Sequence, residues 1–518
     1  MVAIAHTGTV SGVEAQSVDV EICQSRGLPG FDIVGLPHAA LRESRVRVMA
    51  AIANSGLQLP DRHFVVNLAP ADLRKSGASF DLAIAIALLA ACDLCQADGL
   101  QQTLLLGELA LDGRLRSVRG VLAQLRSARS HGWTTAIIPR EDAAWSALVP
   151  DMRVRVANHL REVVDHFGGT DQLPLSSSVL AGLSDASPAA LGGVDLQDVI
   201  GQETGKRALE VAAAGRHNLI MVGPPGAGKT MLASRLPGLL PPPTADEALE
   251  IATIASVAGT MAGPERGWTR PFRAPHHSCS EAALVGGGHP IKPGEVTLAH
   301  RGVLFLDEIP EFRRVALEAL RPTMESGVAV IVRARECVMM PAVPLLVAAM
   351  NPCPCGYADD PKRMCRCSYD QVERYRARVS GPLVDRFDLH VQLSAVPVQS
   401  LADARRGASS EQVRARVIAA RAHADERRRS AAVGEDRRDD RALDAAARSL
   451  LLTCIDKLGL SLRAYHKVLR VAHTLADLDG SDPVHKHHVA EAVQYRVLDR
   501  DPNARLDLGA NGALRGDA

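Results

Sequence analysis

The sequence has few aromatic residues, no excess of either charge and no long apolar run. Aromatic side chains make up 3% of the 518 residues, and the formal net charge at pH 7 is zero. A balanced charge excludes a uniformly basic nucleic-acid binder, because phosphate binding needs a local excess of Lys and Arg. The longest apolar run, Leu82 to Cys92, is shorter than the roughly 18 residues of a membrane-spanning helix, so it predicts a buried helix and no membrane partner.

The ten cysteines are predicted to be reduced thiols. The segment from Met1 to Val10 has neither the charged start nor the apolar core of a secretory signal. Because disulfides form in oxidising compartments, we expect a cytoplasmic protein without them.

The composition changes at two places in a chain long enough for about three domains of roughly 150 residues. The first part alternates β-like stretches such as Phe64 to Leu68 with helical ones such as Ala39 to Asn54, and a Gly, Ser, Pro and Ala run follows. After about residue 396 helical patterns dominate, interrupted by the charged stretch from Asp425 to Arg441. The predicted parts are an α/β domain at 1–168, a flexible linker at 169–193, a parallel-sheet core at 194–395, a helical domain at 396–500 and a disordered tail at 501–518.

The central part contains a phosphate-binding loop. It fits G-x-x-x-x-G-K-[ST] and lies between an expected strand, His217 to Val222, and a helix. Its glycines let backbone N–H groups close around phosphates at the positive end of the helix dipole. We expect the lysine to neutralise the β- and γ-phosphates of ATP and the threonine hydroxyl to hold Mg²⁺. The loop consists of Gly223, Pro224, Pro225, Gly226, Ala227, Gly228, Lys229 and Thr230.

Two carboxylates follow an apolar segment further along the chain. Val303 to Leu306 predicts a strand, and Asp307 and Glu308 come directly after it, at the edge of the sheet beside the phosphates. We expect Asp307 to steer Mg²⁺ through its water shell and Glu308 to act as general base toward the attacking water. A further strand, Leu345 to Met350, ends at Asn351, whose amide either caps the strand or orients that water.

Two arginines far along the chain are candidates for contacts with the γ-phosphate. Arg386 has the planar fork that suits charge on a transferred phosphate, and supplied by a neighbouring subunit it would couple hydrolysis to a ring. A structural Asp–Arg pair is the competing explanation. Arg463 in the helical domain is a candidate for a second contact that reports the position of that domain, with Arg470 as a substitute.

Together these motifs resemble the AAA+ proteins of the magnesium-chelatase-like group, and specifically the YifB/ComM family. The resemblance spans nearly the whole chain and rests on Gly30-Phe-Asp-Ile-Val-Gly-Leu-Pro37, on Arg270-Pro-Phe-Arg-Ala-Pro-His-His277 with Gly286-Gly-Gly288, and on Asn351-Pro-Cys-Pro-Cys-Gly356. It implies a hexameric DNA helicase that promotes branch migration while incoming single strands recombine during natural transformation, with single-stranded and branched DNA as partners. The positions that match the family's Walker A, Walker B, sensor 1, arginine-finger and sensor 2 residues are Lys229, Asp307, Glu308, Asn351, Arg386 and Arg463.

The N-terminal part is similar to the proteolytic domain of Lon proteases. Lys75-Ser-Gly-Ala-Ser79 before an apolar helix resembles the segment that carries the Lon nucleophile, but the position that matches the catalytic lysine is held by Leu122. Without a base to deprotonate it, Ser79 cannot act as a Lon-type nucleophile. The resemblance therefore implies a degenerate domain that serves as a ring-forming or DNA-guiding scaffold.

Two insertions are candidates for gripping a polymer in the pore of a ring. The first runs from about Gly259 to Pro293 and is rich in glycine, and the second is a hairpin-like segment from Val328 to Met340. Their basic residues suit loops that contact phosphates, and ordinary exposed charge is an equal alternative. Few aromatics accompany them, so the pattern favours backbone tracking over base stacking. The DNA-binding candidates are Arg270, Arg273, His276, His277, Lys292, Arg333 and Arg335.

Four cysteines after the Asn351 strand form the pattern C-x-C-x9-C-x-C. Cys353, Cys355, Cys365 and Cys367 could complete a tetrahedral Zn²⁺ site, and a polar loop without a core of its own gains stability from a metal. The C-x-C spacing is tighter than the usual C-x2-C, and free thiols are the alternative. The pattern favours structural zinc.

The motifs together predict an ATP-driven, ring-forming DNA translocase of the α/β class, with a degenerate Lon-like domain, an AAA+ core and a helical lid domain. One alternative is a chelatase-type ATPase that remodels a partner protein, against which the Lon-like domain and the lack of a long acidic, metal-binding partner region weigh. An ATP-dependent protease is disfavoured by Leu122. A nucleotide-gated scaffold is disfavoured by Glu308, because a binding-only module has no use for a general base.

Overall fold

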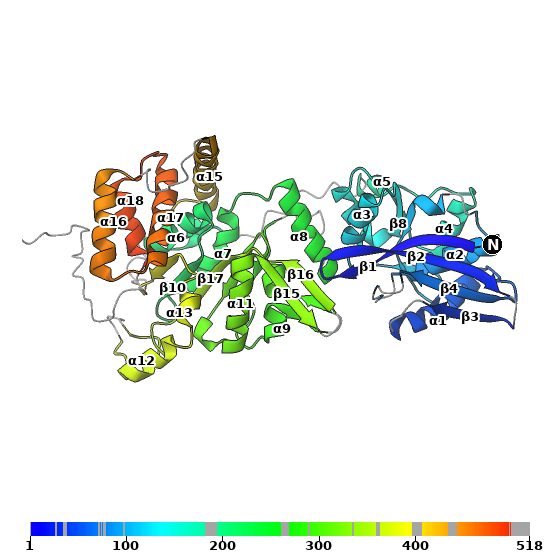
Figure 1. The fold of residues 1–518 in the computed structure, drawn as a ribbon, viewed down its shortest axis with the longest axis horizontal. Helices are drawn as coiled ribbons and strands as arrows, with labels where there is room; N and C mark the ends of the chain where they lie inside the picture. The colour runs from blue at the N-terminus through cyan, green and yellow to red at the C-terminus, as the bar shows by residue number, and fades with distance from the viewer. Residues whose placement is uncertain are drawn as a thin grey trace, which may run out of the picture.

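The chain folds into three parts that follow one another in a row, in chain order (Figure 1). The computed structural model describes residues 2–498 apart from 26–27, 35–38, 71–72, 74, 76–78, 97–98, 182–193, 261–268, 289–290, 334–335, 359–362, 396–406, 434–442 and 497. The tail predicted at 501–518 lies outside these residues. Within them, every helix falls short of the length or the hydropathy that a membrane span requires.

The N-terminal part contains a seven-stranded sheet in the order β3-β4-β2-β1-β5-β8-β9. Its strands β1 and β2 form a long antiparallel pair, and β5, β8 and β9 extend the sheet in parallel. The predicted buried helix is confirmed as α2, in which every residue is buried. The strands are β1 Val2–Ser11, β2 Glu14–Ser25, β3 Gly30–Val34, β4 His63–Ala69, β5 Thr103–Leu105, β6 Glu108–Leu109, β7 Leu115–Arg116, β8 Thr135–Pro139 and β9 Arg153–Ala157, and the helices are α1 Ala39–Asn54, α2 Asp81–Ala91, α3 Val121–Ser130, α4 Leu160–Phe167 and α5 Ser176–Ala181.

Ordered structure continues into the segment that was expected to be a flexible linker at 169–193. Leu173 is buried in the core of the N-terminal part, and helix α5 ends only at Ala181. Leu175 also forms an isolated β-bridge with Arg155 of β9. Only residues 182–193 of that segment lie outside the described part of the chain.

The central part is built on a five-stranded parallel sheet in the order β11-β14-β17-β10-β18. The predicted strands at Val303–Leu306 and Leu345–Met350 are confirmed as β14 and β17, and every residue in them is buried, as expected where helices cover both faces. The strands are β10 Leu219–Val222, β11 Phe272–Arg273, β14 Val303–Leu306, β17 Leu345–Met350 and β18 Leu389–Gln392, and the helices are α6 Glu203–Gly215, α7 Lys229–Leu239, α8 Ala245–Ala258, α9 Glu281–Leu284, α10 Glu295–Leu298, α11 Arg314–Ser326, α12 Tyr369–Arg376 and α13 Gly381–Val384.

Helix α8 and a β-hairpin join the core to the N-terminal part. The predicted hairpin is confirmed as β15 Val328–Arg333 paired with β16 Glu336–Pro341, beside a smaller pair, β12 Gly286–Gly287 and β13 Lys292–Pro293. Ser256 of α8 accepts hydrogen bonds from the main-chain N–H groups of Gly120 and Leu122, and Val13 packs with side chains of α8 and the hairpin. These contacts hold the Lon-like part against the core.

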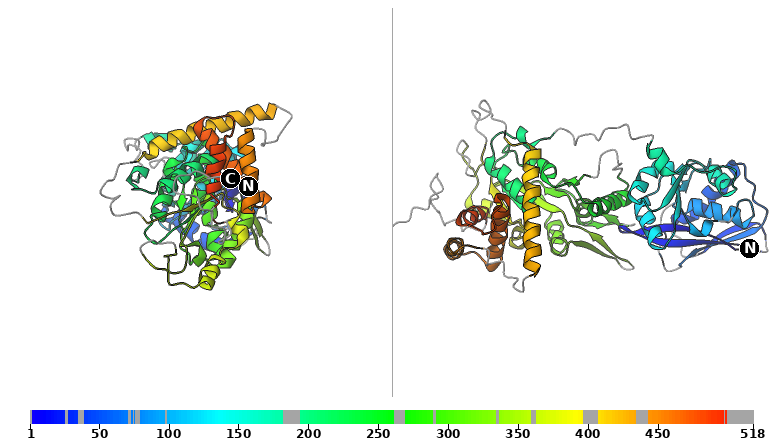
Figure 2. Two further views of the ribbon diagram at one scale, coloured as in Figure 1. Left: turned by 90° about the vertical axis from the view of Figure 1, so that its left-hand side faces the viewer. Right: turned by 90° about the horizontal axis from the view of Figure 1, so that it is seen from above.

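The C-terminal part consists of helices that share a hydrophobic core with α6 and α7. Its helices are α15 Ser410–Val433, α16 Ala445–Leu458, α17 Leu462–Asp479 and α18 Lys486–Gln494. The long helix α15 packs against α6, α7 and α17 (Figure 2). The interruption predicted over Asp425 to Arg441 starts too early, because α15 continues through the charged residues to Val433. Exposed charge is compatible with a helix packed along one side. The rest of the predicted stretch, 434–441, lies outside the described residues.

Candidate nucleotide-hydrolysis site

The predicted phosphate-binding and carboxylate motifs meet at one edge of the core sheet. Val222 at the end of β10 pairs with Met350 of β17, and Leu306 at the end of β14 pairs with Ala348 of the same strand. The residues that follow these strands therefore come together where parallel strands end, which is where α/β sheets bind their ligands. We call this edge the hydrolysis edge; it holds the P-loop, Asp307, Glu308 and Asn351.

The P-loop has the backbone that a phosphate cradle requires. Gly226 and Gly228 have φ angles of +79° and +85°, in the left-handed region where a side chain is disfavoured. At Gly223 a Cβ atom would lie 2.7 Å from the main-chain oxygen of Leu393, so only glycine allows the loop to approach the end of β18. Helix α7 begins at Lys229, and its first N–H groups complete the cradle.

Lys229 points into the same edge. Its Nζ donates to the main-chain oxygen of Gly223 at 2.6 Å and to Oδ1 of Asn351 at 3.0 Å. Burial lowers the pKa of Lys229, and the opposing charges of Asp307 and Glu308 raise it. The ammonium group therefore lies within reach of the predicted sensor amide and in the field of both carboxylates, as a phosphate-binding lysine must.

Thr230 and Asp307 form an oxygen pair suited to a hard cation. The Thr230 hydroxyl donates to Oδ2 of Asp307 at 2.7 Å, and Oδ1 of Asp307 accepts the main-chain N–H of Glu308 at 3.0 Å. Mg²⁺ prefers one or two such oxygens together with phosphate oxygens and water. The donor set at this edge therefore fits Mg²⁺ bound with a nucleotide.

Glu308 is held in an uncommon backbone conformation beside a histidine. Its φ angle is +51°, which is rare for a residue other than glycine and is typical of functional sites. Nδ1 of His277 lies 3.7 Å from Oε2 of Glu308. The sequence placed His277 among the DNA-binding candidates, and the structure places it next to the predicted general base. His277 follows β11, which lies beside β14 in the sheet, so it connects the first insertion to the hydrolysis edge.

Arg386 lies at the other edge of the sheet. Leu389 at the start of β18 pairs with Leu219 at the start of β10, and the two strands run in parallel. Arg386 comes before β18, whereas the P-loop comes after β10, so the length of the strands separates them. Arg386 pairs with Glu325 of α11.

Arg463 lies beside Arg386 rather than beside the P-loop. Burial lowers the pKa of Arg386, and the nearby positive charge of Arg463 lowers it further. Lys467, one turn along α17 from Arg463, donates to the main-chain oxygen of Phe387 at 3.1 Å, which fixes the helix at this edge. Arg470, the substitute, is 3.6 Å from Asp388. Neither predicted arginine therefore faces the nucleotide site of its own chain.

The basic residues of the two insertions have different surroundings. The side chain of Arg270 is only 7% exposed and donates to Glu247 and to three main-chain oxygens, and Arg273 forms two hydrogen bonds with Glu295. His276 and Lys292 are exposed, as is Arg333, which lies against Gly287 of the first insertion. Arg335 lies outside the described residues. The two insertions thus meet at β12 and β15, with Lys292 and Arg333 on their surface.

The four cysteines come together in the loop after Asn351. Sγ of Cys353 lies 3.3 Å from that of Cys355 and 3.6 Å from that of Cys365, and all four sulfur atoms lie within 4.8 Å of one another. A tetrahedral zinc site with Zn–S bonds of about 2.3 Å has sulfur atoms about 3.8 Å apart, and a disulfide has them at about 2 Å. The main-chain N–H of Ala358 also donates to Sγ of Cys353, at 3.2 Å. The arrangement fits a zinc ion.

The Lon-like part holds Leu122, which the sequence resemblance matches with the Lon lysine, in its packed interior. Leu122 in α3 is fully buried, and its surroundings include the helix α8 of the core. Ser79 is buried as well, and its hydroxyl donates to the main-chain oxygen of Gly8 at 3.4 Å. The local structure is that of a packed interface.

Comparison with known proteins assigns nearly the whole chain to a family. Family models match residues 20–142 (subunit ChlI of Mg-chelatase), 195–401 (magnesium chelatase, subunit ChlI) and 407–496 (the C-terminal part of that subunit). The chain is 44% identical over 505 residues to the uncharacterized protein YifB of Salmonella typhimurium, which covers 96% of this chain and 97% of that protein. It is 44% identical over 503 residues to the competence protein ComM of Haemophilus influenzae, which covers 96% of this chain and 98% of that protein. The chain belongs to the YifB/ComM family.

Members of the YifB/ComM family are magnesium-chelatase-like AAA+ proteins, which implies ATP and Mg²⁺ as cofactors. The resemblance predicted from the three sequence motifs is thereby confirmed. A shorter match covers the N-terminal part: the chain is 33% identical over 136 residues to Lon protease 2 of Bacillus subtilis, 25% of each chain. The predicted Lon-like similarity is confirmed as well.

Proposed function

We propose that this protein is an ATP-driven, ring-forming DNA translocase and that it acts as a branch-migration helicase on recombination intermediates during natural transformation. The observation that carries the proposal is the division of the catalytic groups between two edges of one sheet. The P-loop and both carboxylates lie at one edge, and Arg386 and Arg463 lie at the other. Similarity over nearly the whole chain to a competence protein supports the DNA substrate.

Hydrolysis follows from the geometry of the hydrolysis edge. Lys229 binds the β- and γ-phosphates, and Thr230 and Asp307, whose oxygens are 2.7 Å apart, hold the metal ion. Mg²⁺, when bound, neutralises charge on the phosphate oxygens. Glu308 takes a proton from a water molecule, and the oxygen of that water attacks the γ-phosphorus. The bond between the γ-phosphorus and the oxygen that bridges it to the β-phosphate breaks, and ADP and phosphate leave. His277 positions Glu308 through its ring nitrogen.

A ring of identical subunits explains the position of the two arginines. In a head-to-tail ring, one edge of each core faces the opposite edge of its neighbour. Arg386 and Arg463 would then reach the γ-phosphate held by the next subunit, and each site would be complete only in the assembly. We propose a hexamer, formed when ATP or DNA is bound.

DNA would contact the surface where the two insertions meet. Lys292 and Arg333 are exposed there and carry positive groups that bind phosphates, and His276 is exposed elsewhere in the first insertion. Arg270 does not belong to this surface, because its N–H groups donate to internal acceptors. His277 connects the same insertion to Glu308, so DNA binding and ATP hydrolysis share one structural element.

The cysteine loop and the Lon-like part have supporting roles in this proposal. Zn²⁺ held by the four thiolates would cross-link a loop that starts at Asn351 and contacts the P-loop, since a Cβ on Gly356 would lie 2.6 Å from Pro225. The Lon-like part has leucine at position 122, where the resemblance expects a lysine, and it packs on α8. It would therefore be a scaffold without peptidase activity. Both roles are structural.

A chelatase-type ATPase that remodels a partner protein is the second candidate, because the matching family models are those of magnesium chelatase subunit ChlI. Similarity over nearly the whole chain to a competence protein favours the helicase over it. A fluorescent branched DNA incubated with ATP separates the two. A helicase should convert the branched DNA, and this conversion should be lost in Lys229→Ala.

Arg333→Gln should weaken DNA binding more than Arg129→Gln, which removes an exposed arginine paired with Asp151 in the N-terminal part. No conversion, together with turnover raised by unfolded protein, would favour the remodelling ATPase.

A further inference from the structure

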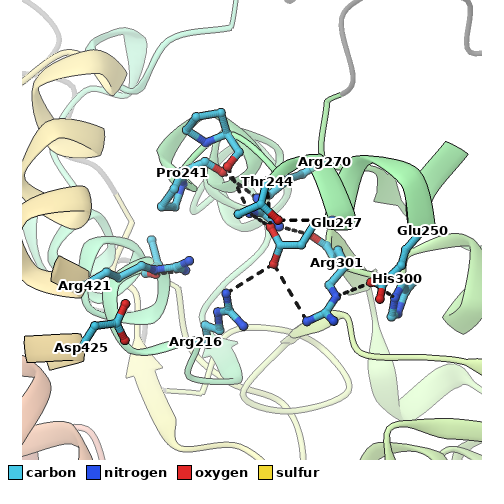
Figure 3. Close-up of polar contacts among 12 residues, drawn as sticks. Arg216, Pro241, Thr244, Glu247, Glu250, Arg270, His300, Arg301, Arg421 and Asp425 are labelled. Atoms are coloured by element: carbon cyan, nitrogen blue, oxygen red, sulfur yellow. Dashed lines mark hydrogen bonds and ion pairs between the residues drawn. The ribbon is translucent and has the colours of Figure 1, made fainter. Parts of the chain in front are cut away.

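A basic cavity of about 180 Å³ lies between the core and the helical part. Its wall includes Asn218 before β10, Gly302 before β14 and Leu345 at the start of β17, so it opens at the sheet edge opposite the hydrolysis edge. Arginines from four separate segments line it, as Figure 3 shows. They are Arg216 after α6, Arg270 before β11, Arg301 before β14 and Arg421 of α15.

One carboxylate in the wall forms ion pairs with three of these arginines. Oε2 of Glu247 lies 2.6 Å from Arg270, and Oε1 lies 3.5 Å from Arg216 and 3.9 Å from Arg301. Arg301 has a second partner in Glu250, at 2.8 Å, which His300 shares at 3.0 Å. Glu247 is the one acidic residue among the described residues that line the cavity, so positive charge exceeds negative charge there.

Arg421 has no carboxylate within 4.0 Å among the described residues (Figure 3). Its Nε and Nη2 both donate to the main-chain oxygen of Ala213, and Asp425 on the same helix acts on it only at longer range. Burial, followed by the charges of Arg216 and Arg270, lowers the pKa of Arg421 to about 10. A half-buried cation among like charges costs free energy that a bound anion would offset.

The backbone at two of these arginines supports a role for the cavity. Arg216 and Arg301 have φ angles of +54° and +59°, and they are two of the five described residues other than glycine with positive φ; the proposed general base Glu308 is another. Glycine adopts this conformation without the steric cost that a side chain incurs. Arginine at both positions therefore indicates that the side chains are needed, and residues held in this region concentrate at functional sites.

We infer that this cavity binds a phosphate-bearing anion that bridges the core and helix α15. The planar guanidinium forks of Arg216 and Arg421 match the oxygens of a phosphate group, and they come from the two parts that the anion would join. The phosphate could belong to a free oligophosphate or to the backbone of a nucleic acid. The inference stands independently of the proposed helicase function.

Calorimetric titration of the full-length Lys229→Ala protein with inorganic pyrophosphate tests the inference, because that variant removes phosphate binding at the P-loop. We expect one remaining binding site. Adding Arg421→Gln should weaken it about tenfold or more, and adding Arg429→Gln, an exposed arginine two turns along α15, should leave it unchanged. Arg216→Gln, whose side chain is 58% exposed, should weaken it too and is not expected to disturb folding. No binding in Lys229→Ala, or binding that neither pocket substitution weakens, would overturn the inference.

The source of the phosphate is found by competition in the same Lys229→Ala protein. A short single-stranded oligonucleotide that displaces pyrophosphate, and that binds less tightly after Arg421→Gln, would identify a nucleic-acid backbone. If pyrophosphate binds and the oligonucleotide does not displace it, the ligand is a free oligophosphate. Either result leaves the cavity a phosphate site.

Discussion

Arg386→Ala should stop ATP hydrolysis by removing a group from the neighbouring subunit's site. Loss of an arginine that stabilises the transferred phosphate costs about 10³-fold or more in kcat. ATP affinity should change little, because Lys229, Thr230 and Asp307 lie at the other edge of the sheet, a full strand away from Arg386. Phosphate release and nucleotide binding, measured on the same preparation, separate these two quantities.

Mixing two inactive proteins tests whether the arginine acts between subunits. Lys229→Ala has a defective P-loop and an intact arginine, and Arg386→Ala has the reverse. In a random equimolar ring about half of the P-loops are intact and about half of those face an intact arginine, so turnover should recover to about a quarter of the wild-type value per subunit.

A matched control uses the double variant Lys229→Ala with Arg386→Ala in place of the single Lys229→Ala. The double variant has the same defective P-loop but cannot contribute Arg386 to a neighbouring site, so its mixture with Arg386→Ala should stay inactive. Recovery in the control mixture, no recovery in the test mixture, or wild-type turnover by Arg386→Ala alone would show that Arg386 does not act in the site of the neighbouring subunit.

Glu308→Gln should leave ATP bound and unhydrolysed, because an amide cannot take a proton from water, whereas Lys229→Ala should abolish binding; turnover at the wild-type rate in Glu308→Gln would contradict the assigned base. His277→Ala should lower turnover about tenfold with the Kd for ATP unchanged, since the ring lies 3.7 Å from the Glu308 carboxylate, and an equal loss of affinity would argue for a structural role only. Cys355→Ser should release about one zinc ion per chain, measured by elemental analysis, and lower the Tm by about 5 °C or more; wild-type protein without zinc would contradict the metal site.

The elements that carry the nucleotide chemistry could be predicted because their signals are local. Two continuous apolar runs end at polar residues, which is the pattern typical of buried parallel strands. They are Val303–Leu306 and Leu345–Met350. The P-loop pattern also depends on its own residues alone. For β10 the prediction began two residues early, because the N–H of His217 still bonds to Ala212 at the end of α6.

The remaining features depend on which elements become neighbours in space. Strand β11 has only two residues and no periodic signal, so nothing local placed His277 beside Glu308. The position of Arg463 beside Arg386 follows from the packing of α17 against the start of β18, more than 70 residues apart in the sequence. Arg270 resembled a loop residue from its glycine-rich surroundings, and only the fold brings it to Glu247.

ATP turnover by the purified protein, measured without polymer and with branched DNA, single-stranded DNA or unfolded protein, distinguishes a DNA translocase from an ATPase that remodels proteins. Branched DNA should strongly stimulate turnover, and this stimulation should be absent in Lys229→Ala. Turnover that does not change with DNA and rises with unfolded protein would contradict the proposed DNA translocase, and the DNA contacts assigned to Lys292 and Arg333 would have to be withdrawn.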